Sequence, residues 1–106
     1  MKKLMIFVDW FVPGYKGGGQ IRSCANLAYG LKDKMKVYVI TGDKDLADDS
    51  TYPGVRIDEW NEISPGLQVL YLSAARRNYS SIKHIIAEKD PDCWKRRWFF
   101  RRSYSV

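Results

Sequence analysis

Two short, uninterrupted apolar segments constrain the fold of this chain more than any other feature. Residues 3–9 and 36–41 do not alternate apolar with polar side chains, and such continuous runs are typical of strands buried on both faces of a parallel sheet. Between them, residues 20–32 repeat apolar side chains at helical spacing, so one side of a helix can pack on that sheet. The order strand, helix, strand therefore predicts a right-handed βαβ unit.

The second half of the chain predicts two more strands and a second helix. Residues 55–60 and 67–72 are strand-like, and the corner Ser64-Pro65-Gly66 between them favours a hairpin. Residues 74–88 have a helical apolar stripe, and Pro91 lies beyond its end. We expect an α/β fold in β-α-β-(β-hairpin)-α order.

A glycine-rich turn separates the first strand from the first helix. Gly17, Gly18 and Gly19 are consecutive, so a bound molecule can approach the backbone closely. The helix that follows directs free N–H groups and its positive dipole end into the turn, as in anion-binding sites, and Arg22 adds a cation. Gln20 stands where a Walker A loop needs lysine, and Arg22 where the dinucleotide motif needs its third glycine. The alternative is a turn that only connects strand to helix.

Composition limits the partners of the chain. Its net charge is +6 over 106 residues, but residues 94–102 carry five of the cations, so the rest is nearly neutral. A polyanionic partner for the whole protein does not follow. The interleaved aromatic and basic side chains of 94–102 leave open a segment that binds nucleic acid or an anionic membrane.

The same features predict a cytoplasmic protein. Asp9 interrupts the first apolar run before it reaches the length of a signal-peptide core. No run approaches the ~20 apolar residues of a transmembrane helix. Cys24 and Cys93 form no closely spaced pair, which favours free thiols in a reducing compartment.

Several segments in order carry a family resemblance. They are Trp10-Phe11-Val12-Pro13-Gly14-Tyr15-Lys16-Gly17-Gly18-Gly19-Gln20-Ile21-Arg22, then Asn26-Leu27-Ala28-x-x-Leu31, and then Lys36-Val37-Tyr38-Val39-Ile40-Thr41. This order resembles the start of a GT-B glycosyltransferase of the retaining family 4 type. The resemblance extends over about residues 1–92, and it implies the N-terminal, acceptor-side half of a two-domain enzyme with an incomplete Rossmann-like fold.

The family resemblance also assigns roles. It implies that the donor diphosphate faces Gly17, Gly18, Gly19, Gln20 and Arg22. It further implies a nucleotide-sugar donor and a glycan or lipid-linked acceptor, so peripheral association with the inner face of the membrane is left open. The paired glutamates and basic residues of the family's donor domain have no counterpart in this chain. We therefore expect no transfer activity from these 106 residues alone.

Other candidate residues are supported by their type and position. Trp10 and Tyr15 could line an acceptor site at the end of the first strand, or they could be core or interface aromatics. Arg76, Arg77 and Asn78 could contact an acceptor at the start of the second helix, or they could form an exposed helical face.

Two further sets of polar residues are expected to be solvated. His84 lies beside the polar side of the second helix, where a solvated or capping histidine is the expectation. The acidic residues of 43–49 lack the EF-hand pattern, so we expect an exposed loop and no metal site; they are Asp43, Asp45, Asp48 and Asp49.

The resemblance ends after Pro91-Asp92. The family has an apolar strand here, whereas this chain has Cys93-Trp94-Lys95-Arg96-Arg97. Three consecutive cations are unfavourable in the middle of a sheet covered on both faces. We therefore expect a domain at 1–92 and a basic aromatic tail at 93–106 without native structure. A change of reading frame would produce such a tail, and the missing strand would leave the first strand with an unpaired edge.

The alternative function is a small cytoplasmic binding protein whose tail contacts nucleic acid or membrane, with nucleic acid the weaker expectation.

Overall fold

A computed structural model describes residues 2–8, 10–12, 19–44 and 50–97 of the chain. In these residues the elements follow one another as β1 (Lys3–Val8), α1 (Gly19–Leu31), β2 (Lys36–Gly42), β3 (Trp60–Ser64), β4 (Leu67–Leu72), η1 (Ala74–Arg76, a short 3-10 helix), α2 (Tyr79–Lys89) and β5 (Cys93–Arg97). The α/β class predicted from the sequence is confirmed.

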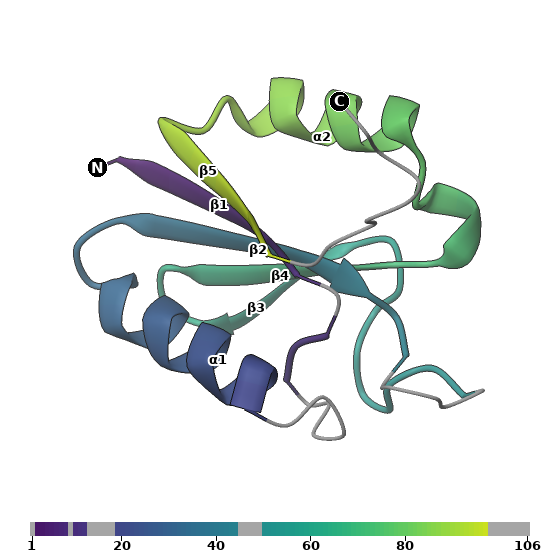
Figure 1. Ribbon diagram of the computed structural model, residues 1–106, viewed down its shortest axis with the longest axis horizontal. Helices are drawn as coiled ribbons and strands as arrows, with labels where there is room; N and C mark the ends of the chain where they lie inside the picture. The colour runs from purple at the N-terminus through teal and green to yellow at the C-terminus, as the bar shows by residue number, and fades with distance from the viewer. Residues whose placement is uncertain (1, 9, 13–18, 45–49, 98–106) are drawn as a thin grey trace.

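The strands form one mixed sheet between the two helices. Their order is β3-β4-β2-β1-β5, with β4, β2, β1 and β5 parallel and β3 antiparallel at one edge. Helix α1 lies on one face and α2 on the other (Figure 1). The chain runs from β1 to β2 and β4 on one side, and then returns to β5 on the other side of β1. This reversal at β1 is that of a doubly wound sheet, and it is compatible with part of a Rossmann-like fold.

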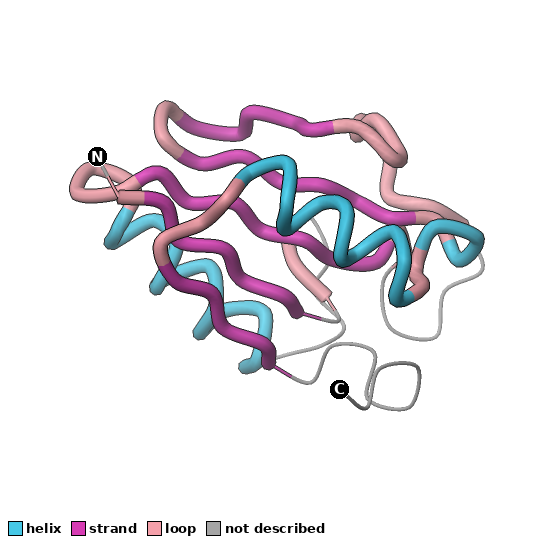
Figure 2. The backbone as a smooth tube through the Cα atoms, turned by 90° about the horizontal axis from the view of Figure 1, so that it is seen from above, coloured by secondary structure: helices cyan, strands magenta, loops and turns pink. Residues whose placement is uncertain are grey.

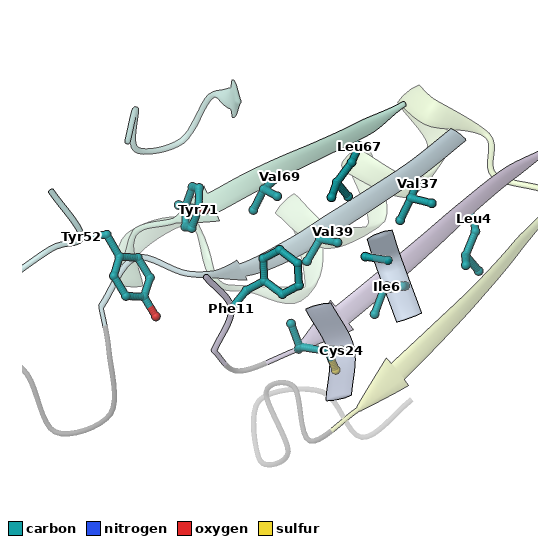
Figure 3. Packing of buried hydrophobic residues seen from close by; sticks show 12 residues of the cluster. Leu4, Ile6, Phe11, Cys24, Val37, Val39, Tyr52, Leu67, Val69 and Tyr71 are labelled. Carbon is teal, nitrogen blue, oxygen red and sulfur yellow. The ribbon is translucent and has the colours of Figure 1, made fainter. Parts of the chain in front are cut away.

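Alternation along each buried strand divides the core into two clusters. On β1, Leu4, Ile6 and Val8 belong to the cluster on the α1 face, whereas Met5 and Phe7 belong to the cluster on the α2 face. The same period of two continues across β2 and β4 (Figure 3). Both sets are apolar because both faces are covered, which explains why the strands read as continuous apolar runs.

The helices bury the stripes that their spacing predicts, with one change. On α1, Ile21, Cys24 and Ala28 are buried against the sheet. On α2, Ile85 is the buried residue, and Ile82 packs partly buried beside it. The predicted stripe of residues 74–88 placed Ala75 and Tyr79 on this side, but both are exposed.

The shorter second helix has a local cause. The chain leaves helical geometry at Arg77 (ψ 71°) and Asn78 (ψ 167°), between η1 and α2. The Asn78 side chain accepts a hydrogen bond from the Ser81 amide at 2.8 Å, and so it caps α2. Figure 2 shows α2 lying over the sheet after this break.

The predicted corner at 64–66 is confirmed as the turn between β3 and β4, but the strand before it is Trp60–Ser64 and not the predicted 55–60. Gly66 has φ +86°, and a Cβ there would lie 2.5 Å from the Lys32 carbonyl oxygen, just beyond the end of α1. The Gly66 carbonyl in turn accepts from the Val37 amide at 2.9 Å. Glycine is therefore required both by the turn and by the close approach of α1.

The expectation for the start of the tail is wrong. Cys93–Arg97 form β5, which pairs in parallel with β1 along its whole length, so β1 has no unpaired edge. Asp92 prepares this pairing, because its carboxylate accepts from the Lys3 amide at 2.7 Å and its own amide donates to the Lys3 carbonyl at 3.0 Å. The physical reason is position: β5 lies at an edge of the sheet, where charged residues are common. Residues 98–106 lie outside the described part of the chain.

Candidate functional site

The candidate site lies at the carboxyl ends of β1, β2 and β4, where open α/β sheets bind their ligands. Residues 10–12 leave β1 toward β4 at this edge. Phe11 is fully buried in the α1-face cluster (Figure 3). The Val12 carbonyl accepts a hydrogen bond of 2.5 Å from the Tyr71 hydroxyl of β4. The segment that enters the glycine turn is therefore fixed to the sheet.

Tyr71 is held in the protonated form that this contact requires. Burial raises the pKa of the Tyr71 hydroxyl well above its ordinary value, and the neighbouring phenols of Tyr52 and Tyr29 raise it further. The rings of Tyr71 and Tyr52 meet edge to face with centroids 5.5 Å apart. The neutral phenol therefore donates a hydrogen bond to the Val12 carbonyl throughout the physiological pH range.

Helix α1 fixes the other end of the glycine turn. Gly19 is its first residue, is exposed, and would place a Cβ in open space. The first turn of α1 has no acidic side chain, so no carboxylate of its own offsets the positive end of the dipole. Arg22 is exposed one turn into the helix. Gln20 follows Gly19 in α1, and the predicted loop residues Gly17 and Gly18 lie outside the described residues.

A carboxylate clamp fixes the end of β4. Asp58 accepts from the Ser73 amide and from the Ser73 hydroxyl, each at 2.9 Å. Its own amide donates to the Tyr71 carbonyl at 2.7 Å. Asp58 adopts φ +62°, a left-handed conformation that aspartate tolerates better than most residues. Ser73 is the N-cap residue of η1, so this clamp sets where the arginines of 76–77 emerge.

The three predicted acceptor-side residues on this segment occupy different environments. Arg76 is exposed, and the Asn78 side chain is used as the cap of α2, where it also donates to the Ala75 carbonyl at 3.1 Å. Arg77 is partly exposed, and its Nη2 lies 4.0 Å from Oδ1 of Asp43, which follows β2. Of the three residues, Arg77 is the one brought to the strand ends beside a second charged group.

The expectation that Asp43 belongs to a solvated loop is wrong. Asp43 is 5% exposed, and its carbonyl accepts from the Tyr52 amide at 2.9 Å. Lys44 and Thr51 form an antiparallel bridge beside this contact, so Thr51 and Tyr52 lie next to the end of β2. The position of Asp43 directly after a buried strand was the signal that sequence reasoning left unused. Asp45, Asp48 and Asp49 lie outside the described residues.

The remaining predicted residues are placed as follows. Trp10 is half-buried after β1, and Tyr15 lies outside the described residues. His84 is exposed on α2. The described ranges contain no cluster of three or more histidine, cysteine or acidic residues arranged to hold a metal ion. Nor do they include a helix with the length and apolar character needed to cross a membrane.

The site thus combines two fixed points around a glycine turn, an uncompensated helix N-terminus, and an acid–arginine pair at the neighbouring strand end. Comparisons with protein-family models, with curated proteins and with solved structures gave no match to this chain.

Proposed function

We propose that this chain is the acceptor-side, N-terminal part of a GT-B glycosyltransferase that uses a nucleotide-sugar donor. The observation that carries the proposal is the position of the two residues that flank the glycine turn, Val12 and Gly19. Its entry is pinned by the bond from Tyr71 to Val12, and its exit is the first residue of α1. Both points lie at the carboxyl edge of a doubly wound sheet, where a diphosphate would meet free helix N–H groups.

The proposal gives each part of the site a task. The exposed start of α1 and Arg22 bind the donor diphosphate, and Gly19 allows its oxygens to approach the backbone. The strand ends around Arg77 face the acceptor. Transfer also needs a donor-binding unit of the same enzyme class, so the 106 residues alone are expected to bind but not to turn over.

The alternative, a binding protein with a separate basic tail, has less support. Cys93–Arg97 are incorporated into the sheet beside β1, so the first part of that segment serves the fold.

The anion site can be tested with a matched pair of glycines on one helix. Gly19 and Gly30 are both exposed in α1, and a Cβ at either meets nothing within 4 Å. Gly19→Val should weaken pyrophosphate binding at least about ten-fold, because the branched side chain stands in front of the free N–H groups. Gly30→Val should leave binding within about two-fold. Phosphorus NMR titration measures both, and equal affinities in the two variants would contradict the site.

The enzyme class needs a separate test. The DNA that follows codon 92 can be read in all three frames. A continuing apolar strand followed by a donor domain with paired glutamates supports the proposal. Frames without such a domain contradict it.

A further inference from the structure

Two buried polar side chains at the end of β2 are unexplained by the fold. Thr41, in the last part of β2, is 0% exposed, and Asp43 just after it is 5% exposed. The Oγ1 atom of Thr41 and the Oδ1 atom of Asp43 are buried without a hydrogen-bond partner among the described residues. A buried oxygen left in this way has lost its hydrogen bonds to water without replacing them, so proteins seldom keep one without a use for it.

The charge next to Asp43 narrows what the carboxylate can bind. The Nη2 atom of Arg77 lies 4.0 Å from Oδ1, too far for a direct hydrogen bond. An oxygen about 2.9 Å from each atom would bridge that separation. This oxygen has to donate to the carboxylate and accept from the guanidinium at once.

Few chemical groups satisfy both neighbours. A phosphate oxygen accepts from Arg77 but is repelled by Asp43, and an ammonium group is repelled by Arg77. A hydroxyl is neutral, and it can donate its proton while accepting through a lone pair. The pair of opposite charges therefore selects a hydroxyl over an ion.

We propose that Asp43 and Arg77 form a subsite that binds a hydroxyl of a sugar ring at the carboxyl end of β2. That the hydroxyl belongs to a sugar rests on the proposed function, and it can come from the acceptor or from the ribose of the donor nucleotide. The location suits this role, because other doubly wound sheets bind ribose hydroxyls with an acidic residue some twenty residues beyond the glycine turn.

The test uses amide chemical shifts of the full, isotope-labelled chain. Uridine and 2′-deoxyuridine differ in one ribose hydroxyl and carry no phosphate, and methyl glucoside represents an acceptor hexose. The proposal expects saturable shifts around Thr41, Asp43 and Arg77 with one of these compounds. Preference for uridine over its deoxy form identifies ribose as the source, whereas binding of the glucoside identifies the acceptor.

Variants separate binding from a structural role. Asp43→Asn keeps the size of the side chain, and it should weaken binding of the sugar at least about ten-fold without lowering Tm. Arg77→Gln changes a partly exposed position and should also weaken binding of the sugar. This variant replaces Asp43→Asn in the test if Asp43→Asn does not fold. Asp33→Asn is the control, because the Asp33 side chain is 84% exposed in the turn that follows α1.

Two results overturn the proposal. One is the absence of shifts with all three compounds. The other is a lower Tm of Asp43→Asn with unchanged sugar binding, since Asp43 is then only a structural partner of Arg77. Pyrophosphate titration of the wild-type chain keeps the two proposals apart. If the wild type does not bind pyrophosphate, the anion site is overturned, but the hydroxyl subsite is not.

Discussion

Among the described residues, the α1 face of the sheet carries a larger buried cluster than the α2 face, and the two clusters are held by different chemistry. The α1-face cluster reaches the strand ends through Phe11, Tyr52 and Tyr71 and includes the neutral hydrogen bond to Val12. The α2-face cluster is smaller, and its rim is formed by Lys89, whose Nζ lies 5.1 Å from the Tyr38 ring centroid and 4.9 Å from that of Trp60.

The difference relates packing to function. The α1 face continues into the glycine turn, so its packing positions the candidate site. The α2 face ends on a solvent-accessible cation and contributes mainly to stability. Substitutions on the two faces should therefore differ in size and in what they disturb.

The largest contrast is expected from two leucines of β4. Leu67 lies on the α1 face and Leu72 on the α2 face, and each is at most 1% exposed. Leu67→Ala should lower the free energy of unfolding by about 4 kcal/mol and Leu72→Ala by about 2–3 kcal/mol, because the larger cluster loses more contacts around the cavity. Urea denaturation measures both. A larger loss for Leu72→Ala would reverse our ranking of the faces.

The next effect tests how closely α1 is docked. Gly66→Ala should cost about 2 kcal/mol or more, because its Cβ meets the Lys32 carbonyl as well as an unfavourable positive φ. Gly54 has φ +76° with nothing within 4 Å of a Cβ, so Gly54→Ala should cost only about 1 kcal/mol. If both variants lose the same free energy of unfolding in thermal or urea denaturation, the end of α1 moves away from the added Cβ without a cost in stability.

Tyr71→Phe should cost about 1 kcal/mol at neutral pH, because the hydrogen bond to Val12 is lost. The raised pKa of Tyr71 adds a pH dependence. Above pH 10 the unfolded chain releases this proton while the folded chain retains it, so the free energy of unfolding falls as pH rises. Alkaline denaturation curves should be flatter for Tyr71→Phe than for wild type.

The control for this titration is Tyr79→Phe, because Tyr79 is 47% exposed. Its alkaline curve should follow that of the wild type. A Tyr71→Phe curve as steep as the wild-type curve would contradict the assignment of the pH dependence to Tyr71.

The smallest effect is expected at the rim of the α2 face. Lys89→Met keeps the length of the side chain but removes the charge over two rings, and it should cost about 0.5–1 kcal/mol. Lys83→Met removes a charge 5.6 Å from the exposed ring of Tyr79 and should change stability by only a few tenths of a kcal/mol. Thermal melts of the pair measure the difference, and equal shifts would remove any special role for Lys89.

The first strand of the hairpin lies at Trp60–Ser64 and not at the predicted 55–60. Local patterns were sufficient for β1, α1, β2 and the corner of the hairpin. Each depends on the spacing of its own apolar residues or, at Pro65-Gly66, on turn chemistry within a few positions. The break before α2 is also local, because Asn78 caps the helix, but the apolar stripe of residues 74–88 continues through this position and conceals the break.

The features that sequence reasoning missed depend on distant contacts. Whether Cys93–Arg97 can be a strand depends on its place at an edge beside β1, and that place is set by the order of the whole sheet. The burial of Asp43 depends on the return of the chain to Tyr52. Neither contact is encoded in the residues that immediately surround the position.

The pairing of β1 with β5 has a consequence for the folding of the chain. Leu4 is in register with Cys93, so one side of β1 finds its partner only when nearly all of the described chain is available. During synthesis, α1 and β2 can associate with β1 early, whereas the last ladder must wait for translation to reach Arg97. Such distant pairings slow folding and leave an open strand edge in the interim. The interval between these two events is the period in which the nascent chain is most exposed to misassociation.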